Sequence, residues 1–120
     1  MPQYVDGFVI PVPKKNLKAY LKMAKAASKV WKDHGALEYR EAIGEDLKTK
    51  FGLPFNKLAK AKPTETVVFS WIVYKSRAHR DKVNAKVMKD PRIAAMCDPK
   101  DSPFDADRMS YGGFTIEVSA

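Results

Sequence analysis

Hydrophobic and polar positions along the chain follow two periods, and these predict six regular elements. Alternation of β-forming residues predicts four strands, over 4–12, 36–44, 66–74 and 108–118. Apolar residues spaced three or four apart predict two helices, over 14–34 and 77–89. The order strand–helix–strand–strand–helix–strand is that of the ferredoxin-like βαββαβ fold, an α+β class with a four-stranded antiparallel sheet and both helices on one face.

The residues between these elements predict how the elements end. Asn16 could cap the first helix, or that helix could begin slightly earlier. Gly35 is placed to end it, and Ser76 is expected to cap the second helix. Two prolines within 11–13 predict that the end of the first strand lies at an edge or leaves the sheet. The glycine pair at 112–113 predicts a β-bulge or a close backbone approach in the last strand.

Two connections are long enough to be of interest. Residues 45–65 are polar and lysine-rich but carry several large apolar side chains, so a short helix or buried turn is expected over 55–60. A connection of this length within a small domain is often a binding loop or a lid. After a short helical turn over 92–96, residues 97–107 predict a loop anchored by Phe104.

The strand over 66–74 is apolar on both faces. Val67, Phe69, Trp71 and Val73 point one way, and Val68, Ser70, Ile72 and Tyr74 point the other way. Two helices cover one face, so an apolar face of roughly 400 Å² is left without cover. A homodimer with its sheets face to face would bury that surface. The alternative is that the 45–65 loop folds back over it as a lid.

Length, cysteine content and the lack of long apolar runs limit the kinds of protein that this chain can be. The length of 120 residues predicts a single domain over 1–120. The single cysteine excludes a disulfide within the chain. The N-terminus lacks a signal-peptide pattern, and the longest apolar run, 67–74, is too short to cross a membrane, so we expect a cytoplasmic protein with no membrane partner.

Several stretches spread over nearly the whole chain resemble one known family. They are 4–9 (YVDGFV), 34–37 with 44–46, 67–72 (VVFSWI), 90–92 (DPR) and 104–114. Together they resemble the YbaA-like family, small bacterial proteins classed as a domain of unknown function. The resemblance implies the dimeric α+β barrel superfamily, whose members include cofactor-free monooxygenases, haem-degrading enzymes, chlorite-type enzymes and stress-response dimers. It implies no particular activity, so whether the chain is an enzyme stays open.

Metal binding and nucleophilic catalysis have little support in the sequence. The two histidines, His34 and His79, form no HxH or HxxxH spacing, and the single cysteine, Cys97, forms no CxxC pair, so no metal and no cofactor are expected. The negative charge of Asp98 beside Cys97 disfavours the reactive thiolate.

Carboxylates beside aromatic residues give a candidate ligand site. Four acidic side chains lie on or beside strands and could line an inter-sheet cavity: Asp6, Glu38, Glu41 and Asp105. The predicted ligand-binding residues are Tyr39, Glu41, Ser70, Trp71 and Tyr111, and the predicted ligand is a small apolar or aromatic molecule. The alternative for the carboxylates is surface salt bridges to neighbouring arginines. The mid-helix Asn84 could bind a ligand or a neighbouring loop.

The net charge of +8 raises a second possible function. One face of the first helix carries a lysine stripe, formed by Lys18, Lys22, Lys25, Lys29 and Lys32. The stripe could bind a polyanion such as nucleic acid weakly, or it could simply keep the protein in solution. A third alternative is an interaction dimer without chemistry, in which side chains fill the space between the sheets.

Overall fold

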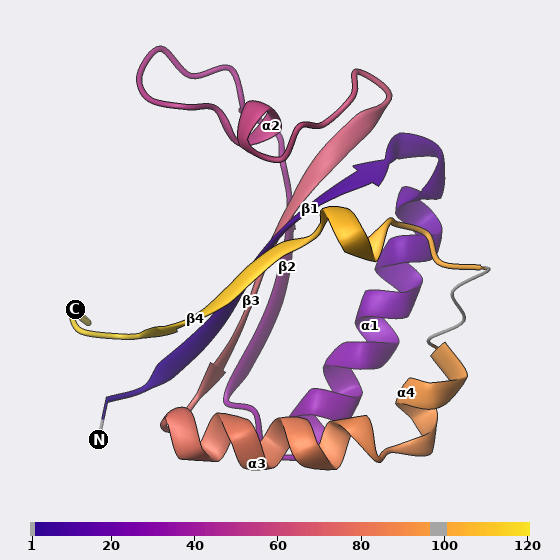
Figure 1. Ribbon diagram of the computed structural model, residues 1–120. Helices are drawn as coiled ribbons and strands as arrows, with labels where there is room; N and C mark the ends of the chain where they lie inside the picture. Colours follow the sequence, from indigo (N-terminus) through magenta and orange to yellow (C-terminus); the bar gives the residue numbers. More distant parts are fainter. Residues whose placement is uncertain (1, 97–100) are drawn as a thin grey trace.

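The computed structural model describes residues 2–96 and 101–120, and it contains every element that the sequence predicts (Figure 1). The strands are β1 (Tyr4–Pro13), β2 (Glu38–Ile43), β3 (Glu65–Tyr74) and β4 (Ser110–Thr115). The helices are α1 (Leu17–Asp33), α2 (Phe55–Leu58), α3 (Arg77–Met88) and α4 (Pro91–Met96). Short 3₁₀ turns, η1 (Lys14–Asn16) and η2 (Ala106–Arg108), precede α1 and β4.

The four strands form one antiparallel sheet in the order β2-β3-β1-β4. Helices α1, α3 and α4 all lie on the same side of this sheet (Figure 1). This is the ferredoxin-like α+β arrangement, so the predicted fold class is confirmed. We call the side of the sheet away from these helices the bare face.

The first strand has different neighbours along its length. It pairs with β3 from Tyr4 to Pro13, whereas its pairing with β4 ends at Val9. Pro11 and Pro13 therefore have a strand partner on one side only, as their missing N–H groups require. The prediction that this end lies at an edge is confirmed.

Two of the three expected helix-end features are present. The Ser76 Oγ accepts a hydrogen bond from the His79 backbone N–H at 3.1 Å, and Gly35 has a φ of 112°, where glycine is favoured. Asn16 precedes α1 but makes no capping bond. The alternative of an earlier start is correct, because the η1 turn begins at Lys14 and runs directly into α1. The Asn16 Nδ2 donates to the Pro103 carbonyl at 3.2 Å.

The glycine pair in β4 leaves room for the side chain of Tyr4. The pairing of β1 with β4 runs without interruption from Tyr4 to Val9, so there is no bulge there. The Tyr4 ring lies directly against Gly113, and a Cβ added at Gly113 would stand 2.6 Å from a Tyr4 ring carbon. The close approach is therefore the correct alternative.

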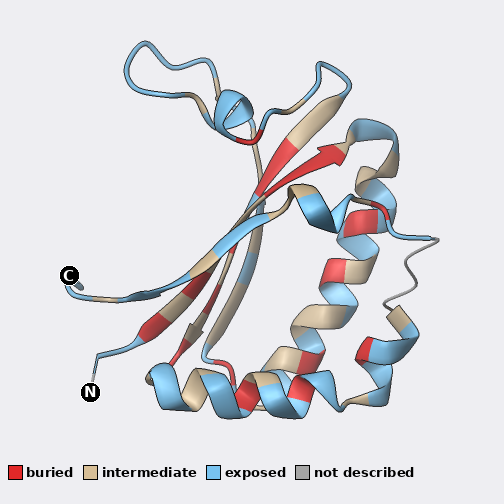
Figure 2. Ribbon diagram, in the orientation of Figure 1, coloured by how far each residue is buried: buried red, intermediate tan, exposed pale blue. Residues whose placement is uncertain are grey.

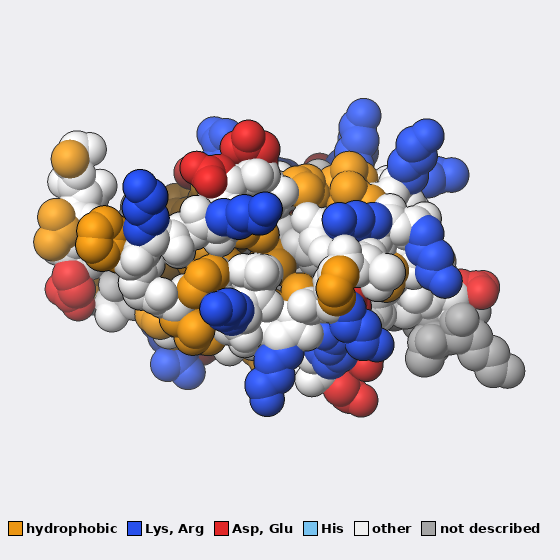
Figure 3. All heavy atoms as spheres, turned by 90° about the horizontal axis from the view of Figure 1, so that it is seen from above, with side chains coloured by type: hydrophobic (Ala, Val, Ile, Leu, Met, Phe, Trp, Pro, Cys, Tyr) orange, Lys and Arg blue, Asp and Glu red, His pale blue; other side chains and the backbone are white. Residues whose placement is uncertain are grey.

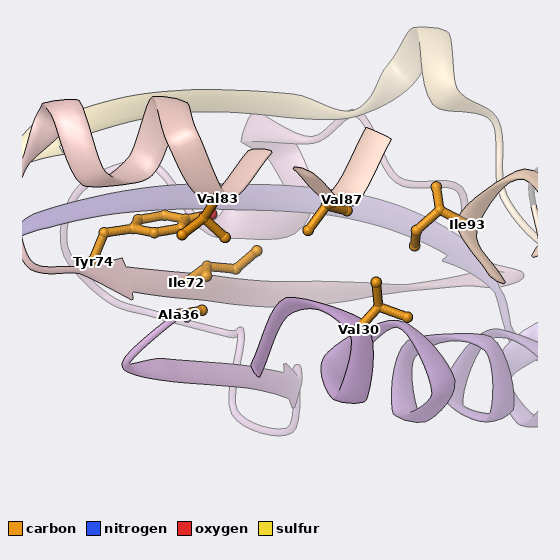
Figure 4. Packing of buried hydrophobic residues seen from close by; sticks show 7 residues of the cluster. All are labelled: Val30, Ala36, Ile72, Tyr74, Val83, Val87 and Ile93. Carbon is orange, nitrogen blue, oxygen red and sulfur yellow. The ribbon is translucent and has the colours of Figure 1, made fainter. Parts of the chain in front are cut away.

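Buried side chains form two clusters between the sheet and the helices (Figure 2). One cluster joins the ends of β2 and β3 to α1, α3 and α4 through Val30, Ala36, Ile72, Tyr74, Val83, Val87 and Ile93 (Figure 4). The other joins β1 and β3 to α1 through Ile10, Val12, Tyr20, Ala24 and Val68. Phe8 packs against both clusters, so it links them.

The bare face keeps large apolar side chains in contact with solvent. Phe69 is 44% exposed and Phe114 is 61% exposed. The 45–64 segment projects beyond the end of the sheet (Figure 1). Phe55 of α2 reaches the bare face, with its ring 5.9 Å from that of Phe69, but no residue of this segment lines the hollow around Val5, Trp71 and Phe114. The alternative that this segment covers the face as a lid is therefore wrong.

Candidate functional site

A cavity of about 580 Å³ lies between the sheet and its helices. Its wall is mainly apolar, with Phe8 and Ile72 from the sheet and Ile93 from α4. Four methionines also contribute, namely Met23, Met88, Met96 and Met109. Because methionine side chains are flexible and polarisable, such a wall can adapt to the shape of a ligand.

The cavity opens to solvent beside β4. Two of its lining residues, Met88 and Tyr111, are 62% and 71% exposed, so they mark the mouth. Tyr111 stacks on Phe8, with ring centroids 6.0 Å apart and planes inclined by 17°. A flat aromatic surface therefore runs from the mouth into the interior.

A carboxylate held by two tyrosines forms one polar end of the cavity. The Tyr20 hydroxyl donates to Glu41 Oε1 at 2.7 Å, and the Tyr39 hydroxyl donates to Oε2 at 2.8 Å. Burial, reinforced by the neighbouring Glu41, raises the pKa of both phenols, so they remain hydrogen-bond donors. Ser70, which is buried, lies opposite Glu41 in the β2–β3 pairing. We call these four residues the Glu41 cluster.

A second carboxylate lies at the other polar end, on β1. The Asp6 side chain is 9% exposed and stands 3.8 Å from the Arg80 Nε. Burial raises the pKa of Asp6, and the positive charge of Arg80 offsets that effect only in part. In the β1–β3–β2 pairing Asp6 aligns with Tyr39, two strands away, which is about 10 Å across the sheet.

Arg80 is fixed beside Asp6 by its other contacts. Its Nη2 donates to the Tyr4 hydroxyl at 3.2 Å, and its guanidinium lies 5.0 Å from the Tyr4 ring centroid. The Nε also stands 3.4 Å from Asp81, whose side chain is 57% exposed. Among the residues described, the Nε is buried and has no hydrogen-bond acceptor in suitable geometry.

Asn84 completes this end of the cavity. Its Oδ1 accepts hydrogen bonds from Trp31 Nε1 and from the Tyr74 hydroxyl, both at 3.1 Å. These bonds tie α1, β3 and α3 together around the polar end. We call Asp6, Arg80 and Asn84 the Asp6 cluster.

The structure brings most of the predicted ligand residues together, but not all. Tyr39, Glu41, Ser70 and Tyr111 line the cavity. Trp71 points to the bare face, where its Nε1 donates to Glu38 at 3.0 Å. Grouping Trp71 with Tyr39 is wrong, because Tyr39 pairs with Ile72 and neighbouring strand positions point to opposite faces.

The cavity also lies on a different side of the sheet from the one predicted. It is enclosed by the sheet and helices of one chain, whereas a cavity between two sheets was expected. Of the four predicted acidic residues, Asp6 and Glu41 line it, while Glu38 lies on the bare face and Asp105 caps η2 by accepting from the Asp107 N–H. A space between paired sheets stays a prediction.

Sequence reasoning missed Tyr20 and Arg80 as site residues. Tyr20 has helical spacing with Ala24 and so reads as an ordinary core position. Arg80 lies among several charged residues of α3, which are typical of a solvated helix face. The sequence did give one indication of this end of the cavity, because asparagine is unusual in the middle of a helix and Asn84 makes its hydrogen bonds on the inward side of α3.

The described residues hold no cluster of three or more side chains suited to binding a metal ion. His34 Nε2 lies 2.8 Å from Asp90, which also pairs with Arg92, so this group joins the end of α1 to the start of α4. The Arg92 hydrogen bond, followed by that of His34, lowers the pKa of Asp90. Cys97 and Asp98 lie outside the described residues.

All five lysines of the predicted stripe are exposed on α1. Viewed from above, Lys and Arg side chains surround the molecule and apolar side chains gather between them (Figure 3). Over the described residues, no helix is both long enough and apolar enough to pass through a bilayer.

Comparison with known proteins identifies the family. Residues 3–106 match the family described as "Protein of unknown function (DUF1428)". The chain belongs to the DUF1428 family. A relative from this comparison, the uncharacterized protein YbaA of Escherichia coli K12, is 43% identical over 112 residues, which cover 93% of this chain and 94% of YbaA. A YbaA protein of Shigella flexneri matches equally well.

Solved structures show that the DUF1428 chain shares its fold with several protein families. An uncharacterized NIPSNAP domain protein from Burkholderia xenovorans has a TM-score of 0.62 at 14% identity, covering 98% of this chain and 97% of that one. A dimeric ferredoxin-like protein from an uncultured marine organism has a TM-score of 0.59 at 12% identity and full coverage of both chains. SnoaB, a cofactor-independent oxygenase from Streptomyces nogalater, has a TM-score of 0.53 at 11% identity, covering 99% and 97%.

Proposed function

We propose that the protein binds a small, mainly apolar or aromatic molecule in the cavity between its sheet and helices. The observation that carries this proposal is a space of about 580 Å³ with an apolar, methionine-rich wall and two separate polar clusters. Ligand pockets commonly have this size and this mixture of apolar wall and few polar groups. The apolar wall would supply affinity, and the Glu41 and Asp6 clusters would fix orientation.

A pair of adjacent alanines on α1 provides the test. Ala27 lines the cavity, whereas Ala26 is exposed and does not line it. A thermal-shift screen of neutral aromatic compounds should find stabilising compounds for the wild type and for Ala26→Trp. Ala27→Trp should lose that stabilisation, because its indole would occupy the cavity. A screen without any stabilising compound, or equal stabilisation of both variants, would refute the proposal.

We also propose that two copies pair through their bare faces. The support is the apolar surface that Val5, Val9, Phe69, Trp71 and Phe114 leave exposed or half-exposed on the sheet. Pairing two such faces would remove this surface from water. Analytical ultracentrifugation should show a dimer that Phe69→Lys dissociates. Leu21→Lys, on an exposed position of α1, should leave it intact, and a monomeric wild type would exclude the pairing.

Weak polyanion binding is a second candidate function. It is favoured by the exposure of all five lysines of the stripe on one helix. Binding of a single-stranded oligonucleotide should weaken steeply with salt, since neutralised phosphates release counterions. Changing Lys22, Lys25 and Lys29 to Gln should weaken it more than changing three other exposed lysines, Lys82 and Lys86 of α3 and Lys89 directly after it. Equal losses would show that net charge alone is responsible.

A further inference from the structure

The charges that line the cavity restrict the ligand. Asp6 and Glu41 are acidic and Arg80 is basic, so the lining has an excess of negative charge. An anionic molecule would be repelled by the lining as a whole, and the Arg80 guanidinium disfavours a cation beside Asp6. A neutral molecule is therefore favoured at the Asp6 cluster.

The Asp6 cluster combines two groups that act together in proton transfer. Asp6 is a buried carboxylate, which can accept a proton. The Arg80 Nε–H is buried 3.8 Å away and makes no hydrogen bond in suitable geometry with any described residue. A buried donor of this kind is costly unless something accepts from it, and an oxygen that gains negative charge would be a strong acceptor.

We propose that Asp6 is a general base that removes a proton from the carbon next to the carbonyl of a neutral aromatic ketone, and that Arg80 binds the resulting enolate oxygen. This inference rests on the proposed function, because the ketone must first bind in the cavity. Asp6 is then a catalytic residue of that site.

The step balances without any other reactant. The C–H bond breaks, and its proton moves to an Asp6 oxygen. The bonding electron pair forms the C=C bond of the enolate, and the carbonyl π pair moves to oxygen, opposite the Arg80 guanidinium. Return of a proton from Asp6 to carbon restores the ketone, so the net reaction is enolisation and, in D₂O, exchange of hydrogen for deuterium.

Burial supports Asp6 in this role. It raises the pKa of Asp6. A general base works best when its pKa lies near the working pH, so this shift makes Asp6 a more effective base near neutral pH. The charged and titratable groups facing Asp6 are Arg80 and Asp81 of α3 and Tyr74 of β3. Arg80 opposes the shift, whereas Asp81 adds to it.

The experiment uses two probes of the same shape. 2-Tetralone carries acidic C1 hydrogens between its ring and its carbonyl, and 2-naphthol is an aromatic analogue of its enol. Proton NMR in D₂O measures the exchange at C1, and NMR titration measures the binding of 2-naphthol. The wild type should accelerate exchange over the protein-free rate. Asp6→Asn should lose about 100-fold or more of that acceleration while still binding 2-naphthol.

Two controls separate catalysis from structure. Asp107→Asn makes the same chemical change at an exposed position outside the cavity and should keep the wild-type rate. The second control needs no variant: the wild-type exchange rate should rise with pH around a midpoint above 3.8, the usual pKa of aspartate.

The role of Arg80 has its own test. Arg80→Lys keeps the charge but loses the Nε–H and should slow exchange at least about 10-fold.

The outcomes for the two proposals are distinguishable. Binding of 2-naphthol without accelerated exchange, or exchange that survives in Asp6→Asn, would overturn the role of Asp6 and leave the binding proposal in place. If neither probe binds and exchange is not accelerated, both proposals fail for aromatic ketones. Acceleration that depends on Asp6 and follows the expected pH profile supports both.

Discussion

Glu65 and Arg108 form a two-point ion pair between the start of β3 and the turn before β4. Arg108 Nη1 donates to Glu65 Oε2 at 2.6 Å, and Nη2 donates to Oε1 at 3.0 Å. The backbone N–H of Lys62 donates to the same carboxylate at 2.8 Å. The Arg108 hydrogen bonds, followed by that of Lys62, lower the pKa of Glu65 from 4.5 to about 2.

This shift predicts a pH-dependent contribution to stability. Because the pKa is lower in the folded state, the contribution is fully present above pH 4.5 and is lost as the pH falls from 4.5 to about 2. Urea unfolding should show Glu65→Gln less stable than the wild type at pH 7, with a difference that shrinks across this window. A difference that does not vary with pH would show that Glu65 stays equally charged in both states.

The glycines of β4 predict a matched pair of variants. A Cβ at Gly113 would collide with the Tyr4 ring, whereas a Cβ at Gly112 would have no neighbour closer than 3.8 Å. Gly113→Ala should lower the free energy of unfolding by about 1–3 kcal/mol, since Tyr4 must move away from Arg80. Gly112→Ala should have little effect. Equal effects in urea denaturation would show that Tyr4 is free to move.

At the scale of the element, α3 depends on the residue that caps its N-terminus, Ser76. The Ser76 hydroxyl accepts from the His79 N–H at 3.1 Å, which satisfies one of the free donors at the helix start. Ser76→Ala should cost about 1 kcal/mol in urea unfolding. Ser28→Ala, which removes a bond to the Lys25 carbonyl inside α1, should cost less because alanine favours a helix interior. The opposite ranking would mean that the cap contributes nothing.

The elements themselves could be predicted because the signals are local. Alternation and helical spacing located all four strands and both long helices, and Gly35 and Ser76 marked helix ends through their own chemistry. The contact of Asn16 with Pro103 could not be predicted, because the two lie 87 positions apart in the chain. No local pattern carries information over that separation.

The side of the sheet that each residue faces was harder to predict. Both faces of β3 are apolar, so its alternation does not reveal which set the helices cover. Trp71 and Tyr39 were therefore assigned to one lining although they lie on opposite faces. Asp6 and Glu41 are acidic residues within strands, and a charged residue in a strand usually faces solvent. Both nevertheless point to the side of the sheet that the helices cover.

At the scale of the whole molecule, the two buried clusters should melt together. Phe8 packs against both, and α1 contributes residues to each, so neither cluster can be lost without exposing the other. We therefore predict a single domain over 1–120 that unfolds in one transition, with calorimetric and van't Hoff enthalpies in agreement. Two resolved transitions would show separate folding units.

The transition also reports on pairing of the chains. If the bare faces pair, the midpoint temperature should rise with protein concentration, because dissociation accompanies unfolding. Phe69→Lys should remove this dependence on concentration. A midpoint that is constant over a hundredfold range in the wild type would contradict the pairing.

The two tryptophans of the chain lie on opposite sides of the sheet. Trp31 lines the cavity and bonds Asn84, whereas Trp71 faces outward beside Glu38. Intrinsic fluorescence thus contains two spatially separate signals, which Trp31→Phe and Trp71→Phe variants would isolate. One emission spectrum would then respond to occupancy of the interior and the other to events at the outer surface, without any attached dye.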